Sequence, residues 1–229
     1  MDIRFPKFIA LLIVVCFPLL GMAQEAIRRL PKQKTTSHIN VVNPPDGYIS
    51  DHGYVDMGLP SGIKWAVCNV GASSPSDYGD YFAWGETSSK ITYDKENSKT
   101  YNKAMEDISG NTSYDAARAN WGNSWCLPTK ADFVELLNEC SWTWIQSDGH
   151  NGYLVKGPNG KSIFLPAAGH RNGATYEAGT YGNYWSSTPH KTREGRHWHA
   201  YLLDFSRNGR HHVARDGRIF GFPVRPVSH

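Results

Sequence analysis

The side chains best suited by type and spacing to chemistry lie close together, between residues 190 and 220. This stretch holds five of the ten histidines of the chain, together with six arginines and Lys191, against three carboxylates. Its net charge is +4, whereas that of the whole chain is +3, so the rest is slightly acidic. Flanking segments at 185–189 and 221–227 are aromatic and proline-rich. A cationic surface between firm ends predicts recognition of an anionic glycan or an acidic protein.

Twelve side chains of this stretch are the candidate ligand-binding residues, and each carries a cationic, imidazole or phenolic group. They are His190, Arg193, Arg196, His197, His199, Tyr201, Arg207, Arg210, His211, His212, Arg215 and Arg218. All of them can donate hydrogen bonds, which suits the oxygens of an anionic partner.

A metal site and a nucleic-acid surface are the alternatives at this stretch. His197 and His199, two residues apart on an expected strand, would share one face and supply half of a zinc or copper site. No cysteine or paired carboxylate nearby completes such a site, so solvated histidines are favoured, and no metal or cofactor is predicted. Arginines alternate with Trp198, Tyr201 and Phe220, as they do in proteins that bind single-stranded nucleic acid. The export signal described below and the weak overall charge disfavour nucleic acid.

Motifs of the common enzyme classes are absent from the sequence. The chain contains no G-x-S-x-G, no H-E-x-x-H and no glycine-rich phosphate loop. Ser186 and Ser187 have histidines nearby in the sequence but belong to an expected strand, and Glu135 and Glu139 lie one turn apart on the solvated face of a helix. The sequence therefore predicts a protein without catalytic activity, with an envelope-acting enzyme as the alternative.

The first 23 residues have the organisation of a secretory signal peptide. Arg4 and Lys7 supply its charged part, residues 8–20 its apolar part and residues 21–23 a small-residue cleavage site. The apolar run is too short to span a membrane, and no later stretch approaches that length. We expect a mature chain that begins near Gln24 and is secreted, at the cell surface or in the periplasm.

A polar, basic stretch follows the signal peptide and predicts a flexible linker over residues 24–53, before one domain over residues 54–227. Three cysteines remain after cleavage: Cys68, Cys126 and Cys140. An exported protein can form disulfides, and an odd number leaves one thiol over. The spacing selects none of the three pairings, and three buried free thiols are the other reading.

Two helices are expected in the middle of the domain. Residues 115–121 predict a short helix that stops at Gly122. Thr129 and Asp132 predict a capping box at the start of a second helix. Phe133 and the apolar residues three, four and seven positions later form the stripe of its buried face, which places Cys140 toward the core.

Short antiparallel strands make up the remainder, and residues 85–112 are expected to form a surface loop. Asn159-Gly160 and Asn208-Gly209 are strong hairpin signals between strand-like runs. In the strand before the second hairpin, Tyr201 and the residues two and four positions later are expected to face inward, and a strand ending at Val224 closes the domain. This pattern predicts an α+β fold.

Seven ordered motif blocks give the domain a family resemblance. They are residues 54–72, 78–86, 115–122, 127–129, 163–169, 182–188 and 221–227. Together they resemble the Fibrobacter succinogenes major paralogous domain, which is abundant in exported proteins of gut Bacteroides. The resemblance implies a C-type-lectin-like, formylglycine-generating-enzyme-like fold, in which terminal strands pair and long loops carry function. It also implies a Cys68–Cys140 disulfide with Cys126 free.

The resemblance adds a further hypothesis about the basic stretch. Some C-type-lectin-like proteins of these bacteria are diversified by retroelements that rewrite adenines and never create Lys, Glu, Gln, Met or Trp. Residues 199–229 contain none of these five types, which either diversification or ordinary divergence explains. The predicted function is a non-enzymatic, exported ligand-binding or adhesion module, and a structural docking component of a surface assembly is the alternative.

Overall fold

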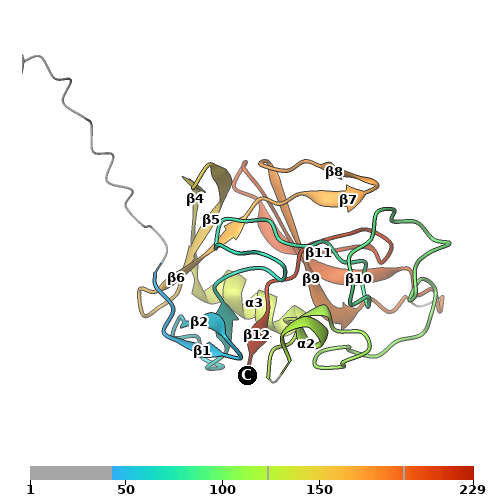
Figure 1. Cartoon of the computed structure of the whole chain (residues 1–229), viewed down its shortest axis with the longest axis horizontal. Coiled ribbons are helices and arrows are strands. Elements are labelled where there is room, and N and C mark those ends of the chain that lie inside the picture. Colours follow the sequence, from blue (N-terminus) through green and yellow to red (C-terminus); the bar gives the residue numbers. More distant parts are fainter. Residues whose placement is uncertain (1–42, 123, 193) are drawn as a thin grey trace, which may run out of the picture. The chain divides into compact units, whose positions relative to one another are not determined.

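The computed structural model describes residues 43–122, 124–192 and 194–229, which Figure 1 shows in colour. The predicted signal peptide, most of the predicted linker and Arg193 lie outside these residues. Strands β1 (Gly47–Ile49) and β2 (His52–Asp56) already belong to a sheet. The ordered domain therefore begins before the boundary expected at Tyr54.

The described chain is mostly β, with two short helices and several small antiparallel sheets, in agreement with the predicted α+β class. The helices are α2 (Ala116–Trp121) and α3 (Lys130–Glu139). The remaining strands are β3 (Lys64–Ala66), β4 (Ser141–Ser147), β5 (His150–Lys156), β6 (Ser162–Pro166), β7 (His170–Asn172), β8 (Ala174–Tyr176), β9 (Tyr181–Pro189), β10 (His199–Ser206), β11 (His211–Gly217) and β12 (Val227–Ser228).

Strands from both ends of the described chain meet in one sheet, in the order β1-β2-β3-β12 (Figure 1). The predicted strand ending at Val224 is wrong, because residues 223–226 join no ladder. Pro223 and Pro226 lack the N–H that a ladder needs. The carbonyls of this segment still accept hydrogen bonds, as that of Val224 does from the N–H of Val70, and regular pairing resumes only at β12.

Both helices begin where the sequence predicts, and α2 also ends at the predicted position. Asp115 caps α2 by accepting a hydrogen bond from the N–H of Arg118, and Gly122 follows the helix at a φ of 70° that suits glycine. At the start of α3, Thr129 and Asp132 form the complete capping box. Local polar chemistry thus fixes both helix starts.

The sheet β11-β10-β9 separates two apolar clusters. Leu203 and Phe205 of β10 pack into the cluster that includes side chains of α3, β5 and β6. Ala200 and Leu202 point the other way, into a cluster built with the 85–112 loop and the C-terminal segment. The expected inward packing is thus confirmed for Leu203 and Phe205. Ala200 and Leu202 are buried as well, because β10 is covered on both faces.

Candidate functional site

The basic stretch forms the predicted hairpin, but its candidate residues do not share one surface. β10 and β11 pair in register, with Asp204 opposite His212 and Tyr201 opposite Arg215. Residues an odd number apart on a strand point to opposite faces. His212 therefore lies on the face of Asp204, and Arg215 on the opposite face, so a small ligand cannot contact both.

Several cations of the stretch are neutralised by nearby carboxylates. The ion pairs are Lys191 with Glu106 at 2.7 Å, Arg196 with Glu194 at 3.0 Å, and Arg210 with Asp204 at 3.3 Å. The first two pairs are largely exposed, where such contacts add little stability. They nevertheless lower the positive charge that the sequence alone suggests.

Arg218 is buried, which contradicts its prediction as a surface ligand-binding residue. The side chain is fully inaccessible, and its guanidinium donates to the carbonyls of His199, Thr100 and Lys103. It also lies 4.2 Å from the ring centroid of Trp84. Arg218 therefore holds the 85–112 loop against the sheet and faces no ligand.

His211 also has a partly structural environment. Its ring stacks on Trp142, with centroids 5.0 Å apart and planes 8° apart, and contacts Tyr153 edge-on at 5.8 Å. The ring is half-buried. His211 thus covers the edge of the apolar cluster in addition to belonging to the hairpin.

The expected His197-x-His199 pair does not form on a strand. β10 begins at His199, and His197 lies in the preceding loop, where its N–H donates to Asn102. The ring of His199 lies 6.2 Å from that of His190, measured between centroids. Within the described ranges, no group of three His, Cys, Asp or Glu side chains could hold a metal ion.

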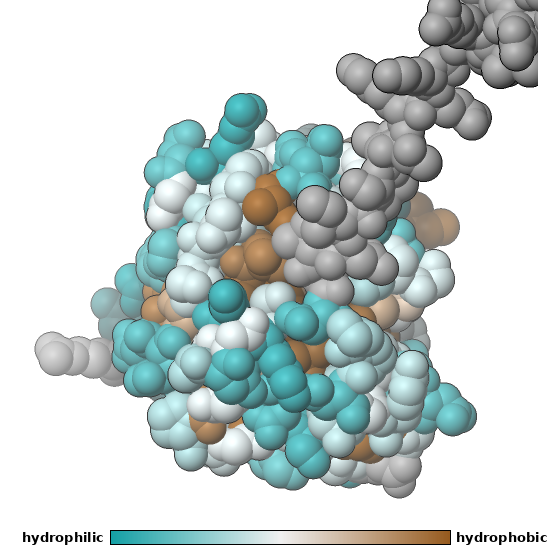
Figure 2. Space-filling model, turned by 90° about the vertical axis from the view of Figure 1, so that its left-hand side faces the viewer, coloured by the Kyte–Doolittle hydropathy of each residue, from teal (hydrophilic) through white to brown (hydrophobic). Residues whose placement is uncertain are grey.

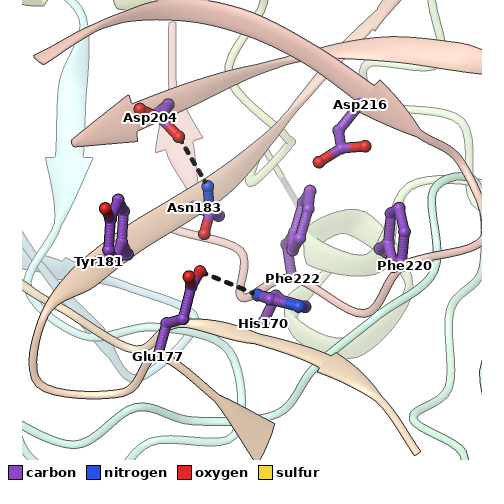
Figure 3. A pocket seen from close by; sticks show the side chains of 8 residues that line it. All are labelled: His170, Glu177, Tyr181, Asn183, Asp204, Asp216, Phe220 and Phe222. Atoms are coloured by element: carbon purple, nitrogen blue, oxygen red, sulfur yellow. Dashed lines mark hydrogen bonds and ion pairs between the residues drawn. The ribbon is translucent and has the colours of Figure 1, made fainter. Parts of the chain in front are cut away.

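A pocket of about 160 Å³ opens on the Asp204 face of the β11-β10-β9 sheet (Figure 3). Asn183 and Asp204 rise from the sheet on one side, and His170 and Glu177 face them from the other. Aromatic rings lie at both ends. The complete lining is His170, Glu177, Tyr181, Asn183, Asp204, Asp216, Phe220 and Phe222.

The β7–β8 hairpin and the turn after it position the far wall of this pocket. β7 is joined to the C-terminal segment through paired hydrogen bonds between Arg171 and Gly221. Gly169 precedes β7 at a φ of 63°, and a Cβ there would overlap the backbone of Tyr176, so only glycine permits this approach. The carbonyl of Glu177 accepts three hydrogen bonds from the residues that lead into β9.

The polar groups of the pocket are only partly paired with one another. His170 Nδ1 lies 3.6 Å from Glu177 Oε2, and Asn183 Nδ2 donates to Asp204 Oδ2 at 3.1 Å. Asp204 Oδ1 is buried and accepts no hydrogen bond from the described residues, although Arg210 pairs with it electrostatically. Burial raises the pKa of Asp216. The pocket therefore holds carboxylates with unused accepting capacity.

The candidate catalytic side chains have structural roles. Ser186 and Ser187 are fully buried within β9, and Ser186 donates to the carbonyl of Tyr201. Glu135 accepts hydrogen bonds from the N–H and the hydroxyl of Ser61 at 2.8 and 2.6 Å. These groups stabilise the β9 strand and a surface turn.

The Cys68–Cys140 disulfide implied by the resemblance is wrong, because Cys68, Cys126 and Cys140 are all free thiols. Cys68 lies near Arg225, whereas Cys140 ends α3 near Glu139. Both side chains pack against the apolar cluster that includes side chains of α3, β5 and β6, but no bond joins them. Burial raises the pKa of all three, to about 11 for Cys126 and Cys140.

In the part of the chain that the structure describes, few large apolar side chains are exposed, and they belong to different segments. They are Tyr48, Ile91, Val134 and Tyr176. On the face drawn in Figure 2, hydrophilic side chains surround a narrow apolar band. Recognition by the described surface is therefore expected to depend on polar groups.

Sequence reasoning missed most residues of the pocket. His170, Glu177 and Asn183 lie outside the basic stretch. Asp204 and Asp216 lie within it, but the sequence shows them only as negative charges that lower its net charge. One signal was available: Asp204 interrupts an otherwise apolar strand. Only the folded arrangement of β7 over β9 brings these groups together.

Comparisons of the chain with protein-family models, with curated proteins and with solved structures find no match. The family resemblance therefore stays a prediction. Among the described residues, no helix is long and apolar enough to cross a bilayer.

Proposed function

We propose that this chain is an exported, non-enzymatic ligand-binding module with a C-type-lectin-like fold, related to the family that its motif blocks resemble. The pairing of strands from both ends of the domain in the β1-β2-β3-β12 sheet supports this fold. The long irregular segment at residues 85–112 supports it as well.

The pocket on the β11-β10-β9 sheet is the observation that carries the binding role. It combines carboxylate and amide oxygens from Asn183, Asp204 and Glu177 with the rings of Phe220 and Phe222. A concave site with a few convergent polar groups beside an aromatic wall is typical of small-ligand binding. Sugar hydroxyls can donate to the oxygens, and the apolar face of a sugar ring can pack on an aromatic ring.

The chemistry of the pocket refines the expected anionic ligand. Three carboxylates line it, so an anionic group inside it would be repelled. We therefore propose a glycan whose neutral ring enters the pocket. Its anionic substituents, or an acidic protein that carries it, would contact exposed cations outside, such as Arg207 at the hairpin turn.

A glycan array followed by calorimetric titration of the best ligand tests this proposal. The variants Glu177→Gln and Asp204→Asn keep the side-chain size but weaken two acceptors. Loss of one charge-assisted hydrogen bond costs about 1.5–3 kcal/mol, so each variant should bind about 10- to 100-fold more weakly.

Glu96→Gln is the matched control, because Glu96 is an exposed carboxylate of the 85–112 loop that does not line the pocket. It should bind as the parent does. Undiminished binding by both pocket variants would show that the ligand is held elsewhere.

A further inference from the structure

A second group of polar side chains lies on the opposite face of the same sheet, beyond the pocket. His190 follows β9, and its ring lies 5.4 Å from the ring of Tyr201. Arg215, opposite Tyr201 in the hairpin, places Nη1 2.8 Å from His190 Nε2. Lys130, the first residue of α3, places its ammonium 4.1 Å from the centroid of Tyr201. Two cations from separate elements thus lie against the neighbouring rings, Lys130 against Tyr201 and Arg215 against His190.

Neither cation forms an ion pair with a carboxylate of the described residues, unlike Lys191, Arg196 and Arg210. The nearby carboxylate of Asp107 accepts a hydrogen bond from the hydroxyl of Thr188 instead. Burial and the positive charges of Arg215 and Lys130 lower the pKa of His190. The other carboxylate beside this group, that of Glu106, is paired with Lys191. The charges of Lys130 and Arg215 are therefore left without a carboxylate partner among the described residues.

The donors of this group match the oxygens of a compact anion. Arg215 uses one nitrogen toward His190, which leaves the other side of its planar fork free for two parallel hydrogen bonds. Lys130 adds up to three donors, and the Tyr201 hydroxyl adds one. A shallow cavity of about 360 Å³ lies alongside and is lined by Tyr201, Thr188 and Lys191. The carboxylates of Glu106 and Asp107 also line it, where Glu106 pairs with Lys191 and Asp107 accepts a hydrogen bond from Thr188.

We propose that Lys130, His190, Tyr201 and Arg215 form a binding site for a sulfate or phosphate group, either free or as an ester on a polymer. The site does not depend on the glycan pocket, because the two lie on opposite faces of the sheet. It also explains why Arg215 and Lys130 are left without carboxylate partners.

The test follows the C2–H resonance of His190 by NMR during titration with sodium sulfate and with sodium phosphate, against sodium chloride at equal ionic strength. The parent should show a saturable shift in the millimolar range with the oxyanions alone. Arg215→Ser and Lys130→Ser should each weaken binding by about tenfold or more, since each removes a charged donor.

Lys156→Ser is the matched control, because Lys156 is an exposed cation of β5, outside the basic stretch, with no ion pair among the described residues. It should leave the titration unchanged, and thermal unfolding should confirm that all three variants fold. Glu177→Gln, which impairs the glycan pocket, should also leave it unchanged, so the two proposals can fail separately.

A second arm uses dextran sulfate against uncharged dextran. Binding of both the free ion and the polymer, dependent on Arg215, assigns the site to the group itself. Binding of dextran sulfate alone, with the same dependence, assigns it to polymeric esters. The inference is overturned when no probe gives a saturable shift beyond chloride, or when Arg215→Ser and Lys130→Ser bind as the parent does.

Discussion

Replacement of Arg218 by Met separates its structural role from the ligand-binding role that the sequence suggests. Met occupies much of the same buried space but donates no hydrogen bonds. The carbonyls of His199, Thr100 and Lys103 would lose their contacts with the guanidinium, and Trp84 would lose a cation at 4.2 Å. The 85–112 loop should therefore detach more readily from the sheet.

The magnitude follows from opposing contributions. Three hydrogen bonds from a charged donor contribute about 1.5–3 kcal/mol each, or roughly 4–9 kcal/mol together, and the cation–π contact adds about 1–2 kcal/mol. Burying the guanidinium opposes this by several kcal/mol, and burial lowers the pKa of Arg218 to about 10. We expect a net loss of about 2–4 kcal/mol, against a typical total stability of about 5–15 kcal/mol.

Urea unfolding followed by tryptophan fluorescence measures this loss. Arg207→Met is the control at an exposed position, and it should change the free energy of unfolding by less than about 0.5 kcal/mol. Below the unfolding transition, Arg218→Met should still bind sulfate and glycan. A variant as stable as the parent, but unable to bind, would refute the buried role of Arg218.

Three further outcomes follow from the described contacts. The chain from Gln24 onward, denatured under oxidising conditions, should show three cysteines that react with a thiol reagent. Before denaturation the reaction should be slow, because burial raises the pKa values of the three thiols. A count of one reactive thiol would show that the disulfide forms. Asp115→Ala should lower the free energy of unfolding by about 3–6 kcal/mol. It removes the α2 cap and leaves the buried N–H of Leu127 and the N–H of Gly110 without an acceptor. A loss below about 1 kcal/mol in urea unfolding would contradict this. The pKa of His190, measured by NMR, should lie below about 6.5 and rise in Arg215→Ser. The imidazole of His190 is then protonated at higher pH in the unfolded chain than in the folded one, so His190 lowers stability as the pH falls below about 6.5. A His190 pKa that Arg215→Ser leaves unchanged would contradict the proximity of the two groups.

Features set by neighbouring residues could be predicted from the sequence. The capping box of Thr129 and Asp132, the Gly122 stop and the Asn208-Gly209 hairpin each depend on a few adjacent residues. Their physical chemistry is complete within a short stretch of chain. The structure accordingly has them where the sequence places them.

Features that depend on distant residues could not be predicted. The alternation in β10 shows one row of apolar residues, yet whether the other row is covered depends on the 85–112 loop and on Phe222. Arg218 resembles its exposed neighbours in the sequence, and only the packing of Trp84 and Lys103 buries it. The pocket likewise needs β7 to lie over β9.

The place of β12 beside β3 has a consequence for how the protein is made. Trp65 of β3 is fully buried, and its partner across the sheet is Val227, close to the end of the chain. At about 5–20 residues per second, synthesis of the intervening segment takes roughly 10–30 s. During that interval β3 lacks one neighbour, and contacts between such distant residues form late in folding. The core around Trp65 can therefore close only after Val227 has been synthesised and has paired with β3.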